Sequence, residues 1–275
     1  MKKIIKIGKE LVEHINDADV MGLSAQLAYF FLLSVFPFLL FLVTLLGFFP
    51  IDDRAFLEFI SAYLPNEVVQ MVDSNLTNIV NNRSGGILSV SILGTLWSAS
   101  NGFNAITKSF NKAYRVEENR SFILNRIISL GLMIGLVFMI AIALVISVFG
   151  RVIGEEVFSF LGLDDYLNAW NIIRWIATSI TFFIALLLLY KLAPNEKVLF
   201  RHAIWGAVFA TVFWQLTSLG FSYYVNTLGN YSTTYGSLGT VIVLMIWFYL
   251  FGIIITTGGV INAYIKERDE EKAAL

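Results

Sequence analysis

Apolar runs of about 20 residues recur along the whole length of this 275-residue chain. A helical run of that length crosses the roughly 30 Å hydrocarbon core of a bilayer. The composition agrees, since 57% of the residues are hydrophobic and only 14% are charged, against about 25% charged residues in soluble domains. The sequence therefore predicts an integral membrane protein that crosses the bilayer with helices.

Six of the apolar runs are long enough to cross, which predicts an all-α, polytopic fold with six transmembrane helices. The predicted spans cover about residues 23–49, 86–107, 122–149, 172–192, 203–221 and 238–264. Together they form a single membrane domain, residues 23–264. An amphipathic cytosolic segment, residues 1–22, precedes this domain, and a charged cytosolic tail, residues 265–275, follows it and is expected to fray.

Two segments outside the spans are amphipathic. The first carries apolar residues at helical spacing among several lysines: Ile4, Ile7, Leu11 and Ile15. This pattern suits a helix on an anionic membrane surface, and a frayed cytosolic tail is the alternative. The second is the first outer loop, residues 50–85, where apolar faces on both sides of Pro65 predict two interfacial helices.

The distribution of Lys and Arg predicts the orientation of the chain. The N-terminal segment, residues 108–126, residues 191–201 and the C-terminal tail hold 15 of the 19 Lys and Arg residues. Loops that are rich in Lys and Arg stay in the cytoplasm. Both termini are therefore predicted to be cytoplasmic.

A polar stripe runs along the second predicted span and continues past its end. Residues at steps of three or four place it on one helical face: Gly94, Trp97, Asn101, Asn104, Lys108 and Asn111. An unpaired amide in hydrocarbon is costly, so the stripe must face protein, water or a bound ligand. Two interpretations stay open. The stripe forms polar contacts between packed helices, or it lines a path for something that binds or moves.

Three other features bear on such a path. Pro37 lies in the middle of the first span and predicts a helix kink there. Gln215, in the fifth span, is expected to hydrogen-bond to a neighbouring helix, with a ligand contact as the alternative. Residues 223–237 form an uncharged, tyrosine-rich segment that includes Tyr231 and Tyr235. That segment suits either a cap over the mouth of the bundle or an interfacial tyrosine belt.

Glycines mark the sixth predicted span. Gly252, Gly258 and Gly259 are expected to allow a close approach of another helix. The partner helix belongs either to the same chain or to a second copy in a dimer. The sequence alone does not choose between these two.

Residues for common catalytic chemistry are scarce. There is no cysteine, and the two histidines, His14 and His202, lie on different segments. No motif of a serine hydrolase, a zinc protease or a phosphate-binding loop occurs. Metal-dependent hydrolysis of RNA needs clustered carboxylates or histidines, whereas Glu117 and Glu118 lie in a basic link that suits solvated charge. We predict that the protein is not an enzyme and that it has no cofactor, no metal site and no nucleic-acid partner.

Short motifs spread over nearly the whole chain carry a resemblance. They are Leu27–Phe30, Ser34–Pro37, Leu96–Ser100, Asn111–Tyr114, Leu192–Pro194, Tyr235–Gly239, Trp247–Leu250 and Gly258–Asn262. In this order they resemble the YihY/virulence factor BrkB family of bacterial inner-membrane proteins, once mislabelled as a ribonuclease. The resemblance implies a six-helix fold in the bacterial inner membrane and a link to envelope processes, including lipid or lipopolysaccharide export. Val260 and Ile261 stand where the family often carries an acidic residue.

These observations predict a transporter, or a flippase- or scramblase-like protein, for an amphipathic envelope lipid or a similar molecule. A non-catalytic scaffold or membrane-integrity protein is the alternative, and a ribonuclease is the least favoured. The predicted partners are membrane lipids, with a second copy or an envelope protein as further partner. The residues predicted to line the path are Trp97, Asn101, Asn104, Lys108, Asn111, Gln215, Tyr231 and Tyr235.

Overall fold

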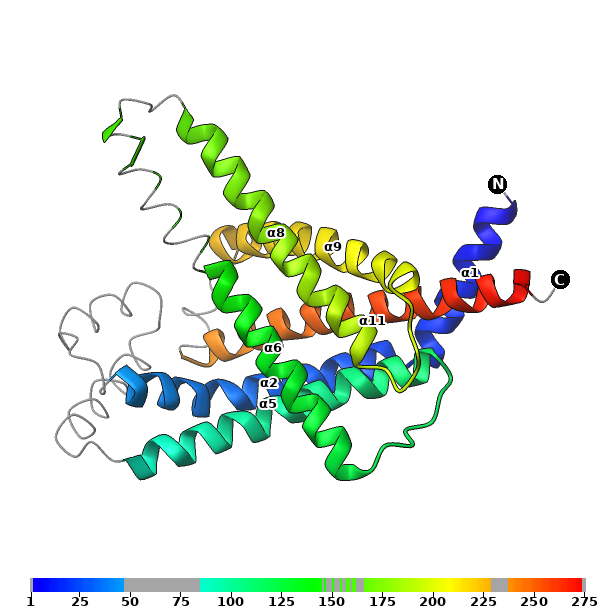
Figure 1. Cartoon of the computed structure of the whole chain (residues 1–275), viewed down its shortest axis with the longest axis horizontal. Helices are drawn as coiled ribbons and strands as arrows, with labels where there is room; N and C mark the ends of the chain where they lie inside the picture. Colours follow the sequence, from blue (N-terminus) through cyan, green and yellow to red (C-terminus); the bar gives the residue numbers. More distant parts are fainter. Residues whose placement is uncertain are drawn as a thin grey trace. The chain divides into compact units, whose positions relative to one another are not determined.

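The computed structural model of the chain describes residues 2–46, 85–144, 166–228 and 237–273, with single positions between 146 and 161. These residues are mainly helical (Figure 1). The helices bounded within them are α1 (Lys2–Asp17), α2 (Val20–Leu46), α5 (Gly85–Ala113), α6 (Phe122–Leu144), α8 (Leu167–Leu192), α9 (Phe200–Leu228) and α11 (Ser237–Ala273). The predicted all-α class is thus confirmed for the described part of the chain.

Each predicted span corresponds to one long helix, but several helices run further than predicted. The helix that contains the second predicted span, 86–107, ends at Ala113, and the helix that contains the sixth, 238–264, ends at Ala273. Among the described residues, α8, α9 and α11 contain segments long and apolar enough to cross a membrane. The segments Gly8–Asp17 and Val20–Val35, bent by 49° at the break between them, would add a fourth. Six crossings and cytoplasmic termini stay predictions.

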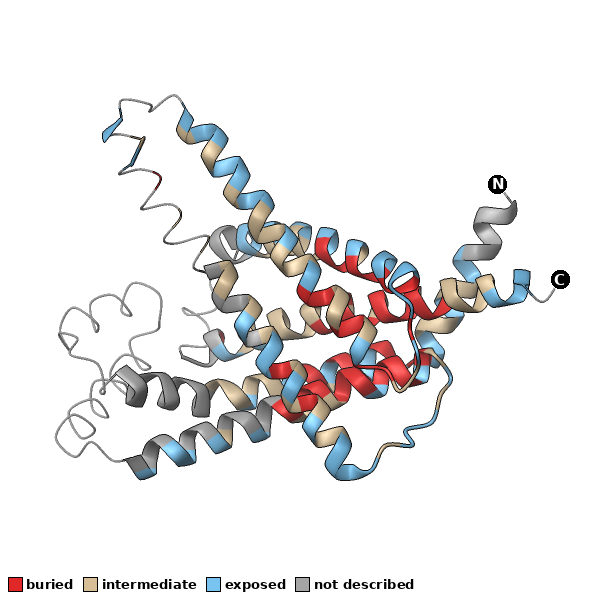
Figure 2. Ribbon diagram, in the orientation of Figure 1, coloured by how far each residue is buried: buried red, intermediate tan, exposed pale blue. Residues whose placement is uncertain are grey.

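The chain divides into two compact units, each of which is described by itself. Unit 1 comprises Met1–Ser24, Phe103–Ser218 and Phe251–Leu275, and unit 2 comprises Ala25–Gly102 and Leu219–Leu250. Four helices, α2, α5, α9 and α11, contribute residues to both units. Within unit 1, buried positions follow α5, α8, α9 and α11 (Figure 2).

Helix α1 packs against the protein in unit 1. Its Leu11 and Ile15 side chains cover a buried cluster of small apolar residues, made of Ala18, Val20, Ala113, Val260 and Ala263. Burial of apolar surface is the main force that holds such a helix in place. The frayed tail was therefore the wrong alternative for residues 2–17, and the apolar face, where it is described, covers protein rather than lying open.

Polar contacts tie α1 to the end of α11. The His14 ring lies within hydrogen-bond distance of the Glu10 carbonyl oxygen at Nδ1 and of the Glu267 carboxylate at Nε2, both at 2.8 Å. The Arg115 guanidinium reaches the same Glu267 carboxylate at 2.8 Å, and the Tyr264 hydroxyl donates to Glu10 at 2.7 Å. The expectation that the charged tail frays was wrong for residues 266–273, because they continue α11.

Glycines of α11 allow close helix approach, as the sequence predicted. A Cβ atom at Gly258 would collide with the Tyr190 hydroxyl, and one at Gly259 would collide with the Phe110 ring. The Tyr190 hydroxyl donates to the Ile255 carbonyl oxygen at 2.9 Å. Both aromatic side chains are fully buried, so they occupy the space that the missing Cβ atoms leave.

Aromatic contacts dominate the described part of unit 2. The Phe31 ring packs edge-on against Phe248, with centroids 5.7 Å apart, and it also fills the space beside Gly102. The Phe221 and Trp247 rings lie 4.8 Å apart between centroids. Such ring pairs add to the energy of apolar burial.

Several predictions fall outside the described residues. These are the interfacial helices of residues 50–85, Tyr231 and Tyr235. The predicted tyrosine-rich segment needs a correction at its start, because Tyr223 and Tyr224 lie inside α9, which continues to Leu228. Pro37 lies within α2, and the kink predicted there stays a prediction.

Candidate functional site

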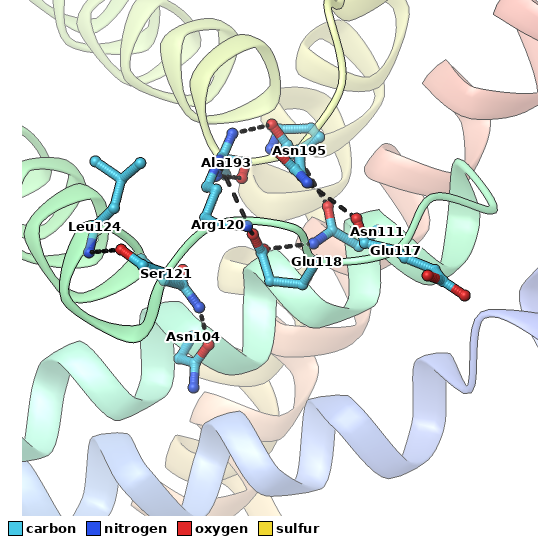
Figure 3. A network of polar contacts seen from close by, with 11 residues as sticks. Asn104, Asn111, Glu117, Glu118, Arg120, Ser121, Leu124, Ala193 and Asn195 are labelled. Atoms are coloured by element: carbon cyan, nitrogen blue, oxygen red, sulfur yellow. Dashed lines mark hydrogen bonds and ion pairs between the residues drawn. The ribbon is translucent and has the colours of Figure 1, made fainter.

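Two links between helices meet in unit 1. The first, residues 114–121, joins α5 to α6 and contains Arg115 in the left-handed region at φ 54°. The second, residues 193–199, joins α8 to α9. Pro194 follows the end of α8, where its ring disfavours continuation of the helix. Hydrogen bonds between the two links and α5 form the polar network drawn in Figure 3.

Asn111 is the centre of this polar network. Its amide group donates from Nδ2 to the Glu118 carboxylate at 2.8 Å, and its Oδ1 accepts from the backbone N–H of Asn195 at 2.7 Å (Figure 3). The residue is 5% exposed. Because both ends of the amide are engaged, Asn111 fixes the end of α5 against the two links.

Arg120 binds backbone carbonyl groups at the C-terminal end of α8. Its guanidinium donates to the carbonyl oxygens of Ala193, at 3.1 Å, and Pro194, at 2.7 Å. The last carbonyl groups of a helix lack intrahelical partners and carry partial negative charge, so a cation there is favourable. Asn195 adds a bond from its side-chain amide to the Glu117 carbonyl oxygen at 2.9 Å.

An ion pair connects the second link to α11. The Lys266 ammonium lies 3.0 Å from the Glu196 carboxylate. The hydrogen bond from Lys266 is the main cause that lowers the pKa of Glu196 below its ordinary value, while partial burial opposes the shift. Burial, and then the charge of Glu196, raise the pKa of the nearby Tyr114 hydroxyl.

The predicted polar stripe on α5 divides into two parts. Asn111 is buried in the network, whereas Lys108 is exposed, and Asn101 and Asn104 are half-buried. The Asn104 side-chain oxygen accepts a long hydrogen bond, 3.3 Å, from the Asn125 amide of α6. Trp97 is 62% exposed. The stripe is therefore a structural contact at one end and an accessible polar face along the rest.

Gln215 makes a bond between helices. Its amide donates to the Ser179 hydroxyl oxygen at 2.8 Å, and that hydroxyl donates to the Trp175 carbonyl oxygen at 2.8 Å. This is the helix contact that the sequence favoured for Gln215. The alternative, contact with a ligand, stays a prediction.

Three residues of the network escaped the sequence-based prediction. Asn195 and Glu196 were not among the predicted site residues, and Glu118 was assigned to solvated charge. No local signal marks Asn195 and Glu196, because their partners Asn111 and Lys266 lie far away along the chain. Glu118 lies seven residues from Asn111, but no sequence pattern marks that pair. The surplus of polar residues after Pro194 is the one visible hint.

The network of hydrogen bonds holds the ends of the helices together, which is a structural role. Within the ranges that the structure describes, no group of three or more His, Asp or Glu residues is placed to hold a metal ion. His14 lies beside the Glu267 carboxylate, and His202 lies 3.5 Å from the Asp269 carboxylate. Neither histidine joins the network around Asn111.

Comparison with known proteins places the chain in a family. The family model described as virulence factor BrkB matches residues 11–275. The chain belongs to the virulence factor BrkB family. The resemblance inferred from the short motifs is thereby confirmed, and the protein is a helical, multi-pass membrane protein of this family.

Relatives extend over most of the chain. A protein of Bacillus subtilis named as ribonuclease-like protein YfkH is 49% identical over 261 residues, or 94% of this chain and 95% of that protein. A UPF0761 membrane protein of Alteromonas mediterranea is 29% identical over 273 residues, or 96% of this chain and 88% of that protein. Another, of Aliivibrio salmonicida, is 30% identical over 262 residues, or 92% of this chain and 81% of that protein. No solved structure matches the chain.

Proposed function

We propose that this protein moves an amphipathic envelope lipid, or a similar molecule, across the bacterial inner membrane. It does so as a transporter or as a flippase- or scramblase-like protein. In this proposal the chain crosses the membrane six times, both termini are cytoplasmic, and no catalytic residue takes part.

The accessible polar face of α5 carries the proposal. Asn101, Asn104 and Lys108 lie at helical spacing and are not sealed inside the fold. An unsatisfied polar group in hydrocarbon costs several kcal/mol, so this face needs water, polar protein or a polar head group beside it. A lipid head group that travels along α5 would meet amide groups there instead of hydrocarbon.

The chemistry of the face favours a passive mechanism. The accessible residues of the stripe are amides, one lysine and Trp97, with no carboxylate among them. Coupling to protons commonly uses acidic or histidine side chains within the membrane. Movement of a lipid down its gradient is therefore the simplest version of the proposal.

The experiment reconstitutes the protein in phospholipid vesicles with a fluorescently labelled phospholipid in both leaflets. A membrane-impermeant reductant then destroys label that reaches the outer leaflet. Wild-type protein should expose the inner-leaflet label, and the Asn101→Ala, Asn104→Ala double variant should not, while it still folds and inserts.

Asn125→Ala is the matched control. It removes the hydrogen bond to Asn104 but leaves the polar face of α5 in place. We expect it to keep the flux. Normal flux in the double variant would remove the stripe from the mechanism, and equal losses in the double variant and in Asn125→Ala would show a packing contact. A wild-type protein without any flux would favour the envelope scaffold instead.

A further inference from the structure

Helices α6 and α8 pack against each other within unit 1 (Figure 1). A groove of about 480 Å³ runs between them. Its lining consists of Ile128, Gly131, Leu132, Gly135, Leu136, Phe138, Met139, Ala185, Leu188, Leu189 and Leu192. All of these residues are apolar or glycine, so the groove offers no hydrogen bond from a side chain to an occupant.

Two glycines open the groove on the α6 side. A Cβ atom added at Gly131 or at Gly135 would meet nothing within 4 Å. The two glycines are four residues apart, so they share one face of α6. The missing side chains therefore leave space that no other described part of this chain fills.

The groove lies within an apolar surface, and part of its lining is buried. Ala185 and Leu189, both on α8, are buried, whereas Phe138 and Leu192 are exposed at its rim. In a membrane protein, an exposed apolar surface of this kind faces the hydrocarbon of the bilayer. The medium that reaches the groove consists of lipid acyl chains.

The length of the groove matches one leaflet. Its α6 side runs from Ile128 to Met139, which spans about 16 Å at 1.5 Å per residue. Half of the roughly 30 Å hydrocarbon core of a bilayer is about 15 Å. An acyl chain from one leaflet therefore fits the groove lengthwise.

One end of the groove lies close to polar residues. Ile128 is near the start of α6, and Leu192 is the last residue of α8. Arg126 lies at the same end of α6, and Lys191, whose ammonium lies 3.4 Å from the centroid of the Phe200 ring, lies at the same end of α8. Every phospholipid carries an anionic phosphate at the head-group end of its acyl chains. Cations near that level are favourable partners for the phosphate.

A second helix is a poorer fit than an acyl chain. Packed helices lie about 8–10 Å apart between axes, and a helix with its side chains is about 10–12 Å wide. A helix from a second copy could cover the rim at Phe138 but not reach the floor at Leu189. A single methylene chain is narrow enough to reach that floor.

We infer that the groove between α6 and α8 binds one acyl chain of a membrane phospholipid, with the phosphate at the end marked by Ile128 and Leu192. The inference goes beyond the proposed path along α5 and does not need the lipid to move. It assigns a binding site and a ligand class to a part of the fold outside the polar network.

The test uses a phospholipid with a photoreactive diazirine on one acyl chain, added to the full-length protein in vesicles. After illumination, labelled peptides are mapped by mass spectrometry. We expect labelling that saturates at one lipid per chain and concentrates in residues 128–139 and 185–192. An excess of unlabelled phospholipid should suppress this labelling, which tests the site without any variant.

Filling the groove provides the second arm. In the Gly131→Leu, Gly135→Leu variant the new Cβ atoms meet nothing within 4 Å, and the leucine side chains occupy part of the groove. Labelling of the groove should therefore fall by about tenfold or more as the acyl chain is excluded. Gly220→Leu on α9 is the matched control, because a Cβ atom there also meets nothing within 4 Å and Gly220 does not line the groove. This control should label like wild type.

Three results would overturn the inference. They are even labelling of all exposed apolar helices without saturation, unchanged labelling in the filled variant, and photochemical capture of a second copy at the groove. The proposed transport is judged separately by the vesicle flux. If the groove is not labelled but lipid flux is intact, the inference about the groove fails and the proposed transport stands. If lipid flux is absent but the groove is labelled, the proposed path on α5 fails and the inference about the groove stands.

Discussion

The glycine pairs of α11 and α6 have opposite surroundings. Gly258 and Gly259 of α11 meet the Tyr190 hydroxyl and the Phe110 ring, which leave no room for a side chain. Gly131 and Gly135 of α6 face open space. Both pairs lie in apolar helices, where glycine lets something approach the backbone closely.

The difference shows what a glycine in a membrane helix does and does not predict. At α11 the neighbour is protein, and large buried aromatic side chains complete the contact. At α6 no described part of the chain fills the space, which leaves room for an acyl chain. A small residue predicts a close approach, but the neighbour decides whether the result is a core or a binding groove.

Enlarging the α11 pair should have the largest effect. Gly258→Val forces a side chain against the Tyr190 hydroxyl and the backbone of Gly206, and overpacking of this kind costs about 1–3 kcal/mol or more. Thermal unfolding in detergent should show a large loss of stability. Gly135→Val is the control, since it carries the same side chain into open space. Equal melting temperatures for the two variants would remove the contrast.

The two ends of the α5 stripe should differ as well. Asn111→Ala removes the partner of the part-buried Asn195 N–H and one of the two hydrogen bonds of the Glu118 carboxylate, which keeps its bond from the Arg120 N–H. We expect a cost of about 1–3 kcal/mol. Asn104→Ala removes one long bond between helices, worth about 0.6 kcal/mol. Thermal unfolding of the two variants measures the gap. A stripe that acts only as packing along its whole length would give similar losses at both positions.

The ion pair between Glu196 and Lys266 predicts a dependence on pH. The folded-state pKa of Glu196 lies below its ordinary value of 4.5, so the ionised carboxylate stabilises the fold at neutral pH. That contribution is lost as the pH falls below 4.5 and through the folded-state pKa. Lys266→Gln should therefore lower stability by about 1 kcal/mol or less near neutral pH and converge with wild type in acid.

Melting temperatures over a pH series measure this effect. Lys272→Gln is the control, because its pair with Asp269 is exposed and such pairs contribute little. A difference in melting temperature between Lys266→Gln and wild type that stays constant at every pH would show that the effect does not depend on the charge of Glu196.

The smallest expected effect is a gain. Gly131→Ala adds a methyl group in open space and relieves the entropic penalty of glycine in a helix, which is about 0.5 kcal/mol or somewhat more. The melting temperature should rise slightly in detergent that is free of phospholipid. A loss of stability would show that the position is packed, as Gly258 is.

The helix positions followed from the sequence because long apolar runs signal helices locally. Pro194 marked the end of α8 for the same reason, since proline acts on its own helix. The extension of α5 beyond residue 107 lies outside the apolar run, and only the helical spacing of Lys108 and Asn111 pointed to it. Asn111 is held by Glu118 and by Asn195, and only the tertiary fold brings Asn195 to it.

The candidate site was predictable only in part. The residues of the stripe lie at helical spacing on α5, but spacing cannot tell which amides find partners. The groove between α6 and α8 left a single trace in the sequence, the glycines of α6, in a span that reads as smooth and aliphatic. Pairs such as Gln215 with Ser179 depend on which helices become neighbours.

The central claim is that this protein binds a specific membrane lipid. Native mass spectrometry tests this claim most directly. The protein is extracted gently from its own membranes beside the Gly131→Leu, Gly135→Leu variant, the Asn101→Ala, Asn104→Ala variant and Gly220→Leu. The account predicts a defined lipid on wild type and on Gly220→Leu, and its loss from the variant with the filled groove. Bulk phospholipid in equal amounts on all four proteins would contradict the account.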